Sequence, residues 1–567
     1  MKLSDYVIDF LAKKGVTHVF GMSGGAVVHL FDSAARHPGI TPIFNTHEQA
    51  SAMAADGYSR VSGKLGVAMA TSGPGVTNLI TGCACSYYDS IPTLMLVGQV
   101  ATNRLKGDLK VRQFGFQETD TEALFAPVTK YAKQLTEPKY IRYVLEKAYH
   151  MAFEGRPGPV LISIPDDLQR ADINPEKLVS FPRQPVGSCE AEPVRVVLDT
   201  VRAAKRPIMI LGQGLKTPEC SGLDELIFKL QVPILATWAG LDRIEYGHPQ
   251  YLGTFGVYGS RLGNWAIQHA DLILCLGTRL SQNLTGAALK TFAPQAKLIM
   301  VDVDGAEMFK FDGRGIDVSG RLKAKLSDFI EKMLHLVSPF EKDNLSWVQE
   351  LKNAGESLPT DHRVSFFEQL SKYLPSDEQI FVDTGANLTW ACNNLHIKKG
   401  QQLHSAWNFT PMGYALPAAI GAAFHKRKPV TCIIGDGGLL VCLAELATVI
   451  RHSLPIRIFL VNNGGHAIQR QTISTWLEGH QVGTDRASGL ALPNFRKIAE
   501  AMGFVSHKYD TVIWDRTLFM MLRNVYTGVP KPEFIDVHFD PSQGLTPFLK
   551  SGDALDRQRP YVKELLG

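Results

Sequence analysis

The sequence predicts an α/β protein made of three successive units, each with a parallel sheet. Short apolar runs of strand length alternate with helical segments along the chain, which is typical of parallel strands joined by crossover helices. The chain has 567 residues, of which 45% are hydrophobic. A chain of this length is too long for one hydrophobic core, so several domains are expected.

The first unit covers residues 1–180. Residues 1–14 place apolar side chains at helical spacing with Asp5 and Asp9 between them, which predicts an amphipathic helix rather than an export signal. The strands that we predict for this unit are at 16–20, 66–70, 93–97 and 160–164.

Two further units follow the first. Residues 182–193 are rich in Pro, Gly and Ser and are interpreted as a linker. The second unit covers 190–336, and its strands are predicted at 207–211, 232–236, 272–276 and 297–303. After a connector at about 336–360, the third unit covers 360–541, with strands at 430–434 and 456–461 on either side of a helix at 443–450. A tail at 542–567 ends the chain.

The third unit carries a pattern that suits a metal-bound diphosphate. Gly435-Asp436-Gly437-Gly438 follows a buried strand, and Asn462-Asn463 follows the next one. Glycines let backbone N–H groups approach phosphate oxygens, while Asp436 and Asn463 offer the oxygen ligands that Mg²⁺ prefers. A backbone carbonyl, for which Gly465 is the candidate, would complete the set. The alternative is a tight strand-to-helix turn with an unrelated Asn-Asn turn.

A second pattern lies near the N-terminus. The segment 46–58 follows an apolar strand and opens a helix with Glu48, and the glycine-rich segments 21–26 and 70–78 stand at two other strand exits. These segments resemble the activating-glutamate region of thiamine diphosphate enzymes. Together with residues 435–463 they resemble the acetohydroxyacid synthase and pyruvate oxidase branch of that family over nearly the whole chain.

The resemblance implies three doubly wound domains: a pyrimidine-binding domain, a central FAD- or nucleotide-binding-like domain and a diphosphate- and Mg²⁺-binding domain. It implies that Glu48 bonds N1′ of the aminopyrimidine and so favours the imino form, whose nitrogen takes the proton from C2 of the thiazolium. Met412 matches the position of the side chain that bends the cofactor. The other cofactor contacts that it implies are Gly437, Gly438, Asn387, His466, Pro74 and Asn78.

The middle unit is placed to hold FAD. The turn Gly212-Gln213-Gly214 follows a strand, Arg279 follows another, and Asp302 lies at a strand end, as in flavin-containing members of this branch. A glycine turn can approach a pyrophosphate, an arginine can pair with it and a strand-end acid can accept from ribose. Relatives that keep this fold with an empty site, or with another nucleotide, are the alternative.

The expected donor is pyruvate. Phe116-Gln117-Glu118 resembles the segment of acetohydroxyacid synthases in which Phe and Gln shape the pocket above the cofactor, and Gly24-Gly25 resembles the loop that faces the reacting carbon. We therefore expect Gly25, Phe116 and Gln117 to join Glu48 as catalytic residues, and pyruvate decarboxylation to be the first half of the reaction.

The acceptor site departs from the best-known synthases. They hold the acceptor keto acid with the last Arg of Arg-Phe-Asp-Asp-Arg and with a Trp after the second metal asparagine; here those positions are Asn283 and Thr472. Losing a charge-assisted clamp costs on the order of 2 kcal/mol of acceptor binding. The prediction is therefore a larger polar acceptor, the keto group of a nucleotide-activated deoxysugar, as in carboligases of yersiniose-type branched-sugar biosynthesis. The predicted acceptor pocket consists of Asn283, Thr472, Gln469 and Ile468.

Four alternatives stay open: acetolactate synthesis from two pyruvates, a pyruvate oxidase, a diketone hydrolase and a non-catalytic relative. Retention of Glu48, Asp436, Asn463 and Met412 argues against the last of these. A net charge of +4 is too small to indicate electrostatic binding of nucleic acid or membrane. The eight cysteines fit neither a zinc pattern nor a disulfide framework, and a cytoplasmic location is expected. The family places the activating glutamate against a neighbouring subunit's diphosphate segment, so a homodimer or homotetramer is expected.

Overall fold

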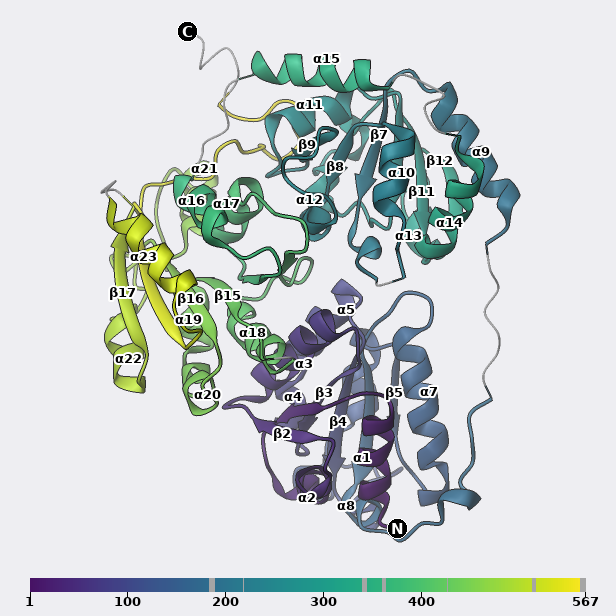
Figure 1. Ribbon diagram of the computed structural model, residues 1–567. Coiled ribbons are helices and arrows are strands. Elements are labelled where there is room, and N and C mark those ends of the chain that lie inside the picture. The colour runs from purple at the N-terminus through teal and green to yellow at the C-terminus, as the bar shows by residue number, and fades with distance from the viewer. Residues whose placement is uncertain are drawn as a thin grey trace.

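The computed structural model contains three α/β domains, coloured purple to blue, blue to teal, and green to yellow in Figure 1. It describes residues 1–182, 189–217, 219–338, 344–358, 364–425, 427–511 and 516–560. Each domain holds a six-stranded sheet in which all neighbouring strands run parallel. The predicted fold class is confirmed. Much of the predicted linker (183–188), parts of the connector (339–343 and 359–360) and the end of the tail (561–567) lie outside the described residues.

The first sheet has the order β2-β1-β3-β4-β6-β5. Its strands are β1 (His18–Gly21), β2 (Thr41–Phe44), β3 (Gly66–Ala70), β4 (Thr93–Gln99), β5 (Tyr131–Gln134) and β6 (Val160–Pro165). Its helices are α1 (Leu3–Lys13), α2 (Val28–Arg36), α3 (Glu48–Ser62), α4 (Pro74–Asn78), α5 (Ile80–Asp89), α6 (Thr121–Phe125), α7 (Ile141–Phe153) and α8 (Asp166–Gln169). The half-buried edge strand β5 was not predicted because its polar residues give a weak strand pattern.

The middle sheet has the order β12-β11-β10-β7-β8-β9, which is the usual strand order of dinucleotide-binding folds. Its strands are β7 (Pro207–Leu211), β8 (Ile234–Ala236), β9 (Tyr251–Thr254), β10 (Leu272–Leu276), β11 (Lys297–Asp302) and β12 (Val318–Lys323). The helices of this part of the chain are α9 (Ala191–Ala203), α10 (Leu223–Leu230), α11 (Arg261–His269), α12 (Gln282–Thr285), α13 (Gly305–Phe309), α14 (Leu326–Leu336) and α15 (Leu345–Glu356).

The third sheet, with the order β14-β13-β15-β16-β18-β17, repeats the topology of the first. Its strands are β13 (Gln379–Val382), β14 (Gln402–His404), β15 (Val430–Gly435), β16 (Ile456–Asn462), β17 (Val505–Asp510) and β18 (Glu533–His538). Its helices are α16 (Ser365–Tyr373), α17 (Ala386–Asn394), α18 (Ala415–Phe424), α19 (Asp436–Val441), α20 (Leu446–Arg451), α21 (Ala467–Trp476), α22 (Phe495–Met502) and α23 (Arg516–Thr527). The predicted helix at 443–450 is instead a 3-10 turn, η9 (Leu443–Glu445), followed by α20.

The first and third domains share one hydrophobic core. Helices α3 and α18 touch backbone to backbone, and they lie side by side where the two domains meet (Figure 1). A Cβ on Gly57 would lie 2.0 Å from the carbonyl oxygen of Ala418, and one on Gly421 would lie 1.8 Å from that of Ala54. Only glycine fits at these two points, so α3 has a fixed position on the third domain. None of the helices among the described residues is long and apolar enough to cross a membrane.

Candidate active site

The predicted metal ligands stand at the carboxyl ends of neighbouring strands in the third sheet. Asp436 begins α19 directly after β15, and Asn463 follows β16. Asp383 follows β13 on the other side of β15. Parallel strands end at the same edge of a sheet, and ligands of open α/β sheets bind at that edge. The fold therefore brings these polar side chains to one place.

The side chains at this edge suit a hard divalent cation. The carboxylate of Asp436 accepts hydrogen bonds from the N–H of Gly437 at 2.7 Å and from the N–H of Gly465 at 2.9 Å, which fixes its orientation. The Oδ1 atom of Asn463 is buried and has no hydrogen-bond partner among the described residues. An unpaired buried acceptor is costly, and an Mg²⁺ ion held by Asp436 and Asn463 would remove that cost.

No group of three His, Cys, Asp or Glu side chains in the described ranges could hold a metal. The predicted site is of another kind and consists of one carboxylate, one amide oxygen and a backbone carbonyl. Gly465, with a φ of 141°, has its N–H committed to Asp436, and its carbonyl stays a predicted ligand. Burial raises the pKa of Asp436, and a cation beside it would lower that pKa again.

The glycines after Asp436 are needed for space. A Cβ on Gly437 would lie 2.3 Å from the Cε1 atom of His466 and 3.3 Å from the terminal methyl of Met412. A Cβ on Gly438 would lie 2.1 Å from the Oδ2 atom of Asp383. The structure thus places the predicted residues Met412, Gly437 and His466 together.

Asp383 is the main residue of this site that the sequence analysis missed. Its carboxylate accepts from the N–H groups of Gly413 at 2.9 Å, Tyr414 at 2.8 Å and Ala415 at 3.0 Å, directly after Met412. Burial raises the pKa of Asp383 to about 6, against the lowering effect of these N–H groups. The signal was an Asp directly after the apolar run 380–382, which the sequence analysis did not interpret as part of a strand.

Asn387 supports the same edge from α17. Its Nδ2 atom donates to the backbone carbonyl of Asp383 at 2.7 Å. Its Oδ1 atom would lie 3.2 Å from a Cβ on Gly435, the residue before Asp436. The predicted cofactor residue Asn387 therefore lies beside the diphosphate segment.

Glu48 begins α3, whose N-terminal partial positive charge favours a carboxylate. The side chain is buried, and its Oε2 atom accepts from the Nδ2 atom of Asn78 at 2.9 Å. A Cβ on Gly75, within the helix that Pro74 opens, would lie 3.3 Å from Oε1. The structure therefore groups the predicted residues Glu48, Pro74 and Asn78.

The segment before Glu48 is held by the third domain of the same chain. Glu445 accepts from the N–H of Thr46 at 2.8 Å, from its hydroxyl at 2.5 Å and from the Nδ2 atom of Asn45 at 3.0 Å. No contact within the described part of the chain joins the Glu48 carboxylate to Asp436, Asn463 or Met412.

One of the predicted donor residues, Gln117, lies near the Glu48 group. Gln117, with a φ of 61°, packs its Cβ 2.9 Å from where a Cβ on Gly73 would lie, at the turn before α4. The carboxylate of Glu118 fixes this loop through three backbone N–H groups. Phe116 is 83% exposed, and a Cβ on Gly25 would meet open space.

Three of the predicted flavin residues stand where the strand order of the middle sheet reverses, Gly212 and Gly214 after β7 and Arg279 after β10, while Asp302 ends the next strand, β11. The N–H of Gly212 donates to the carbonyl of Leu276 at 2.9 Å, and that of Gly214 donates to Gly277 at 3.0 Å. The guanidinium of Arg279 donates to Glu307 at 2.7 Å. Asp302 accepts from the N–H of Asp304 at 2.9 Å. These groups have partners within the protein, so a flavin would have to displace some of them or bind beside them.

Two of the four predicted acceptor residues line one cavity of about 70 Å³, Ile468 and Thr472 on α21. Tyr258 also lines this cavity. Asn283 is adjacent, because its carbonyl accepts from the N–H of Val257 at 2.8 Å. Gln469 does not line the cavity, although Ile468 directly before it does.

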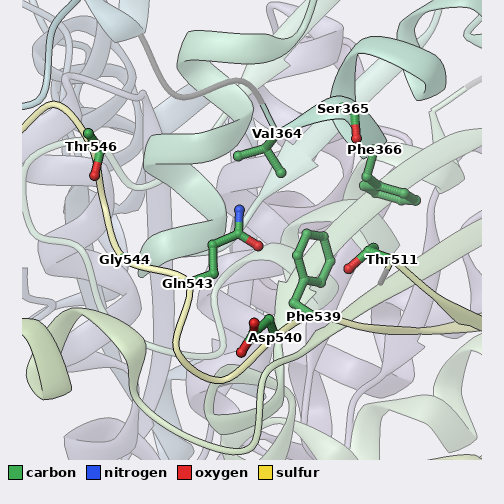
Figure 2. Close-up of a pocket in the computed structure, with 9 residues that line it drawn as sticks. All are labelled: Val364, Ser365, Phe366, Thr511, Phe539, Asp540, Gln543, Gly544 and Thr546. Carbon is green, nitrogen blue, oxygen red and sulfur yellow. The ribbon is translucent and has the colours of Figure 1, made fainter. Parts of the chain in front are cut away.

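A larger cavity, of about 370 Å³, opens elsewhere on the third domain (Figure 2). It contains none of the predicted site residues, and its walls adjoin the segments 359–363 and 512–515, which lie outside the described residues. The residues that line it are Val364, Ser365, Phe366, Thr511, Phe539, Asp540, Gln543, Gly544 and Thr546.

Comparison with known proteins agrees with this geometry. Models of the thiamine pyrophosphate enzyme family match all three domains: the N-terminal TPP binding domain over residues 1–124, the central domain over 194–329 and the C-terminal TPP binding domain over 383–537. A relative, the acetolactate synthase large subunit of Lactococcus lactis, is 31% identical over 563 residues, which cover 97% of this chain and 94% of the relative. The chain belongs to the thiamine pyrophosphate enzyme family.

Other relatives point to the same branch of thiamine pyrophosphate enzymes. The acetolactate synthase isozyme 2 large subunit of Escherichia coli is 33% identical, with 89% of this chain and 90% of the relative covered. A probable acetolactate synthase large subunit of Methanocaldococcus jannaschii is 32% identical, with 100% and 97% covered. This thiamine pyrophosphate enzyme is therefore a carboligase of the acetolactate synthase type.

Proposed function

We propose that this enzyme condenses two molecules of pyruvate to acetolactate with loss of carbon dioxide, using thiamine diphosphate and Mg²⁺. The observation that carries the proposal is the buried, unpaired Oδ1 atom of Asn463 beside the oriented carboxylate of Asp436. It occurs in a chain whose near full-length relatives are acetolactate synthases. The deoxysugar acceptor expected from the sequence has no support among these relatives and stays only as an outcome of the test below.

Each group of site residues has a different role in the proposed reaction. When bound, thiamine diphosphate supplies the carbon nucleophile and the electron sink for decarboxylation. Asp436 and Asn463 would hold the metal that binds the diphosphate, and glycine at 437 and 438 leaves room for the side chains of His466 and Asp383. With the cofactor bound, Glu48 would hold a proton at N1′ of the aminopyrimidine, and Met412 would support the conformation of the cofactor. The part of the site that receives the donor pyruvate consists of Gly25, Phe116 and Gln117.

The proposal includes a second subunit. Glu48 and the metal ligands are not in contact within the described part of one chain, so a copy of the chain would bring a Glu48 to each diphosphate site. Apolar side chains near both half-sites support an interface there, since Phe44 is 50% exposed and Val441 is 53% exposed. A homodimer or a homotetramer meets this requirement. The eight cysteines, all free thiols, support a cytoplasmic location.

FAD belongs to the proposal as a cofactor of the middle domain, supported by the dinucleotide-type strand order and by the position of Gly212 and Arg279 at its reversal point. We expect the purified enzyme to show the visible absorption bands of a flavin, and heat denaturation to release one FAD per chain. A colourless enzyme that takes up no added FAD would contradict this expectation.

Product analysis tests the reaction. Purified enzyme with Mg²⁺, thiamine diphosphate, FAD and ¹³C-labelled pyruvate is expected to form labelled acetolactate, seen by NMR, and removal of Mg²⁺ with a chelator is expected to stop it. A parallel sample contains a nucleotide-linked 4-keto-deoxysugar. Acetolactate in both samples with unchanged sugar supports the proposal. A branched sugar and no acetolactate would overturn it.

A further inference from the structure

The cavity between α21 and the C-terminal segment is close to the reaction site. Helix α21 starts after His466, which contacts the diphosphate segment, and Thr472 lies six residues further on, about 9 Å along the axis. The residues that line this cavity are Tyr258, Ile468, Gln471, Thr472, Thr475, Trp476, Leu545, Phe548, Leu549, Lys550 and Ser551. Lys550 is the charged residue among them.

A 2-keto acid acceptor carries a carboxylate, and an anion inside a partly buried site needs a cation or several donors. The nearby arginines are committed elsewhere. The guanidinium of Arg470 donates to the backbone carbonyls of Asn463 at 3.0 Å and Pro541 at 3.1 Å, and Arg279 is paired with Glu307. The residue at 283 is an uncharged asparagine.

Lys550 differs from these arginines. Its side chain is exposed, and within the described residues its ammonium has no hydrogen bond and no ion pair. The segment before it is held in place, because the amide of Gln471 accepts from the N–H of Leu545 at 2.7 Å and donates to its carbonyl at 3.1 Å. The lysine is thus presented to the cavity by a fixed stretch of backbone.

We propose that Lys550 binds the carboxylate of the acceptor 2-keto acid, in the cavity that Thr472 and Tyr258 also line. The inference rests on the proposed function and deepens it. It explains how the enzyme can use a keto acid acceptor although position 283 is not an arginine. The C-terminal segment supplies the cation instead.

The test compares an anionic acceptor with a neutral one. Wild type, Lys550→Met and Lys550→Arg are supplied with pyruvate as donor and either 2-ketobutyrate or acetaldehyde as added acceptor, and the products are quantified by NMR. We expect Lys550→Met to raise the KM for 2-ketobutyrate about tenfold and to leave acetoin formation from acetaldehyde unchanged. Lys550→Arg is expected to recover most of the lost preference. Lys508→Met, on the exposed face of β17, is the matched control and is expected to behave as wild type.

Equal losses with both acceptors, or no loss with either, would overturn the role of Lys550. A wild-type enzyme that forms no acetolactate would overturn the proposed function and this inference with it. Acetolactate from the wild type together with an unchanged acceptor preference in Lys550→Met would overturn only the inference.

Discussion

Glu48→Gln is expected to lower the rate of acetolactate formation by about 100-fold to 10,000-fold, the range that a positioned acid or base contributes. The substitution keeps the shape of the side chain and its hydrogen bond from Asn78, which is 2.9 Å in the structure. It removes the carboxyl group that would hold a proton at N1′ of the aminopyrimidine. The measurement is exchange of the C2 proton of bound thiamine diphosphate for deuterium, followed by NMR, together with the steady-state rate.

Cofactor affinity separates this role from a structural one. Glu48 is not a metal ligand in the proposal, so Mg²⁺ and thiamine diphosphate should bind Glu48→Gln about as tightly as wild type in calorimetry. Glu331→Gln, on the exposed surface of α14, is the matched control for losing a glutamate and should exchange the C2 proton at the wild-type rate. Wild-type exchange in Glu48→Gln would refute the activation role.

The sequence was sufficient to predict the three-domain architecture and to identify the polar residues that stand at strand ends. Buried strands such as β3, β7 and β10 have continuous apolar patterns, and their predicted ends agree with the structure. The side chains that follow buried strands, such as Asp436 and Asn463, could be identified because parallel strands end at one edge. Weak patterns were missed, as with β5 and with the short strand β13, and with β13 the role of Asp383 was missed too.

Other features depend on contacts between distant segments, which have no local pattern. The cavity that contains Thr472 and Lys550 forms because the C-terminal segment folds back on α21. From the sequence, the N–H groups of Gly212 and Gly214 are candidates to bind a pyrophosphate. Only the structure shows that they donate to carbonyls of the protein, at the end of β10 and at the residue after it. Glycine patterns indicate close approach and do not say which group approaches.

A buried ionic cluster between the first and third domains gives the second prediction. Arg60 on α3 donates to Asp56 at 2.6 Å and to Asp89 at 2.9 Å, and the three side chains are 4%, 0% and 0% exposed. Asp89 also accepts from the N–H of Trp407 at 2.8 Å, and the hydroxyl of Tyr414 donates to Asp56. The loop that carries Met412 runs from Trp407 to Tyr414, so the cluster holds this loop at both ends.

Arg60→Met is expected to lower the free energy of unfolding by about 3–5 kcal/mol, the cost of leaving buried charges without their partner. Arg60→Lys should lose less stability than Arg60→Met, because lysine keeps the positive charge. It should still be less stable than wild type, because lysine cannot make the two-sided contact with Asp56 and Asp89. The measurement is the midpoint of urea denaturation followed by circular dichroism. We also expect weaker thiamine diphosphate binding in Arg60→Met, because the Met412 loop loses one of its supports.

The source of the loss can be isolated by neutralising the whole cluster. If uncompensated charge causes the destabilisation, the triple variant Arg60→Met/Asp56→Asn/Asp89→Asn should recover part of the midpoint lost in Arg60→Met. A triple variant less stable than Arg60→Met would instead assign the effect to lost hydrogen bonds with Trp407 and Tyr414. Arg36→Met, which breaks exposed pairs with Asp32 on α2 and with Asp5 on α1, is the matched control and should change the midpoint little. An Arg60→Met midpoint equal to that of the control would show that this cluster does not hold the two domains together.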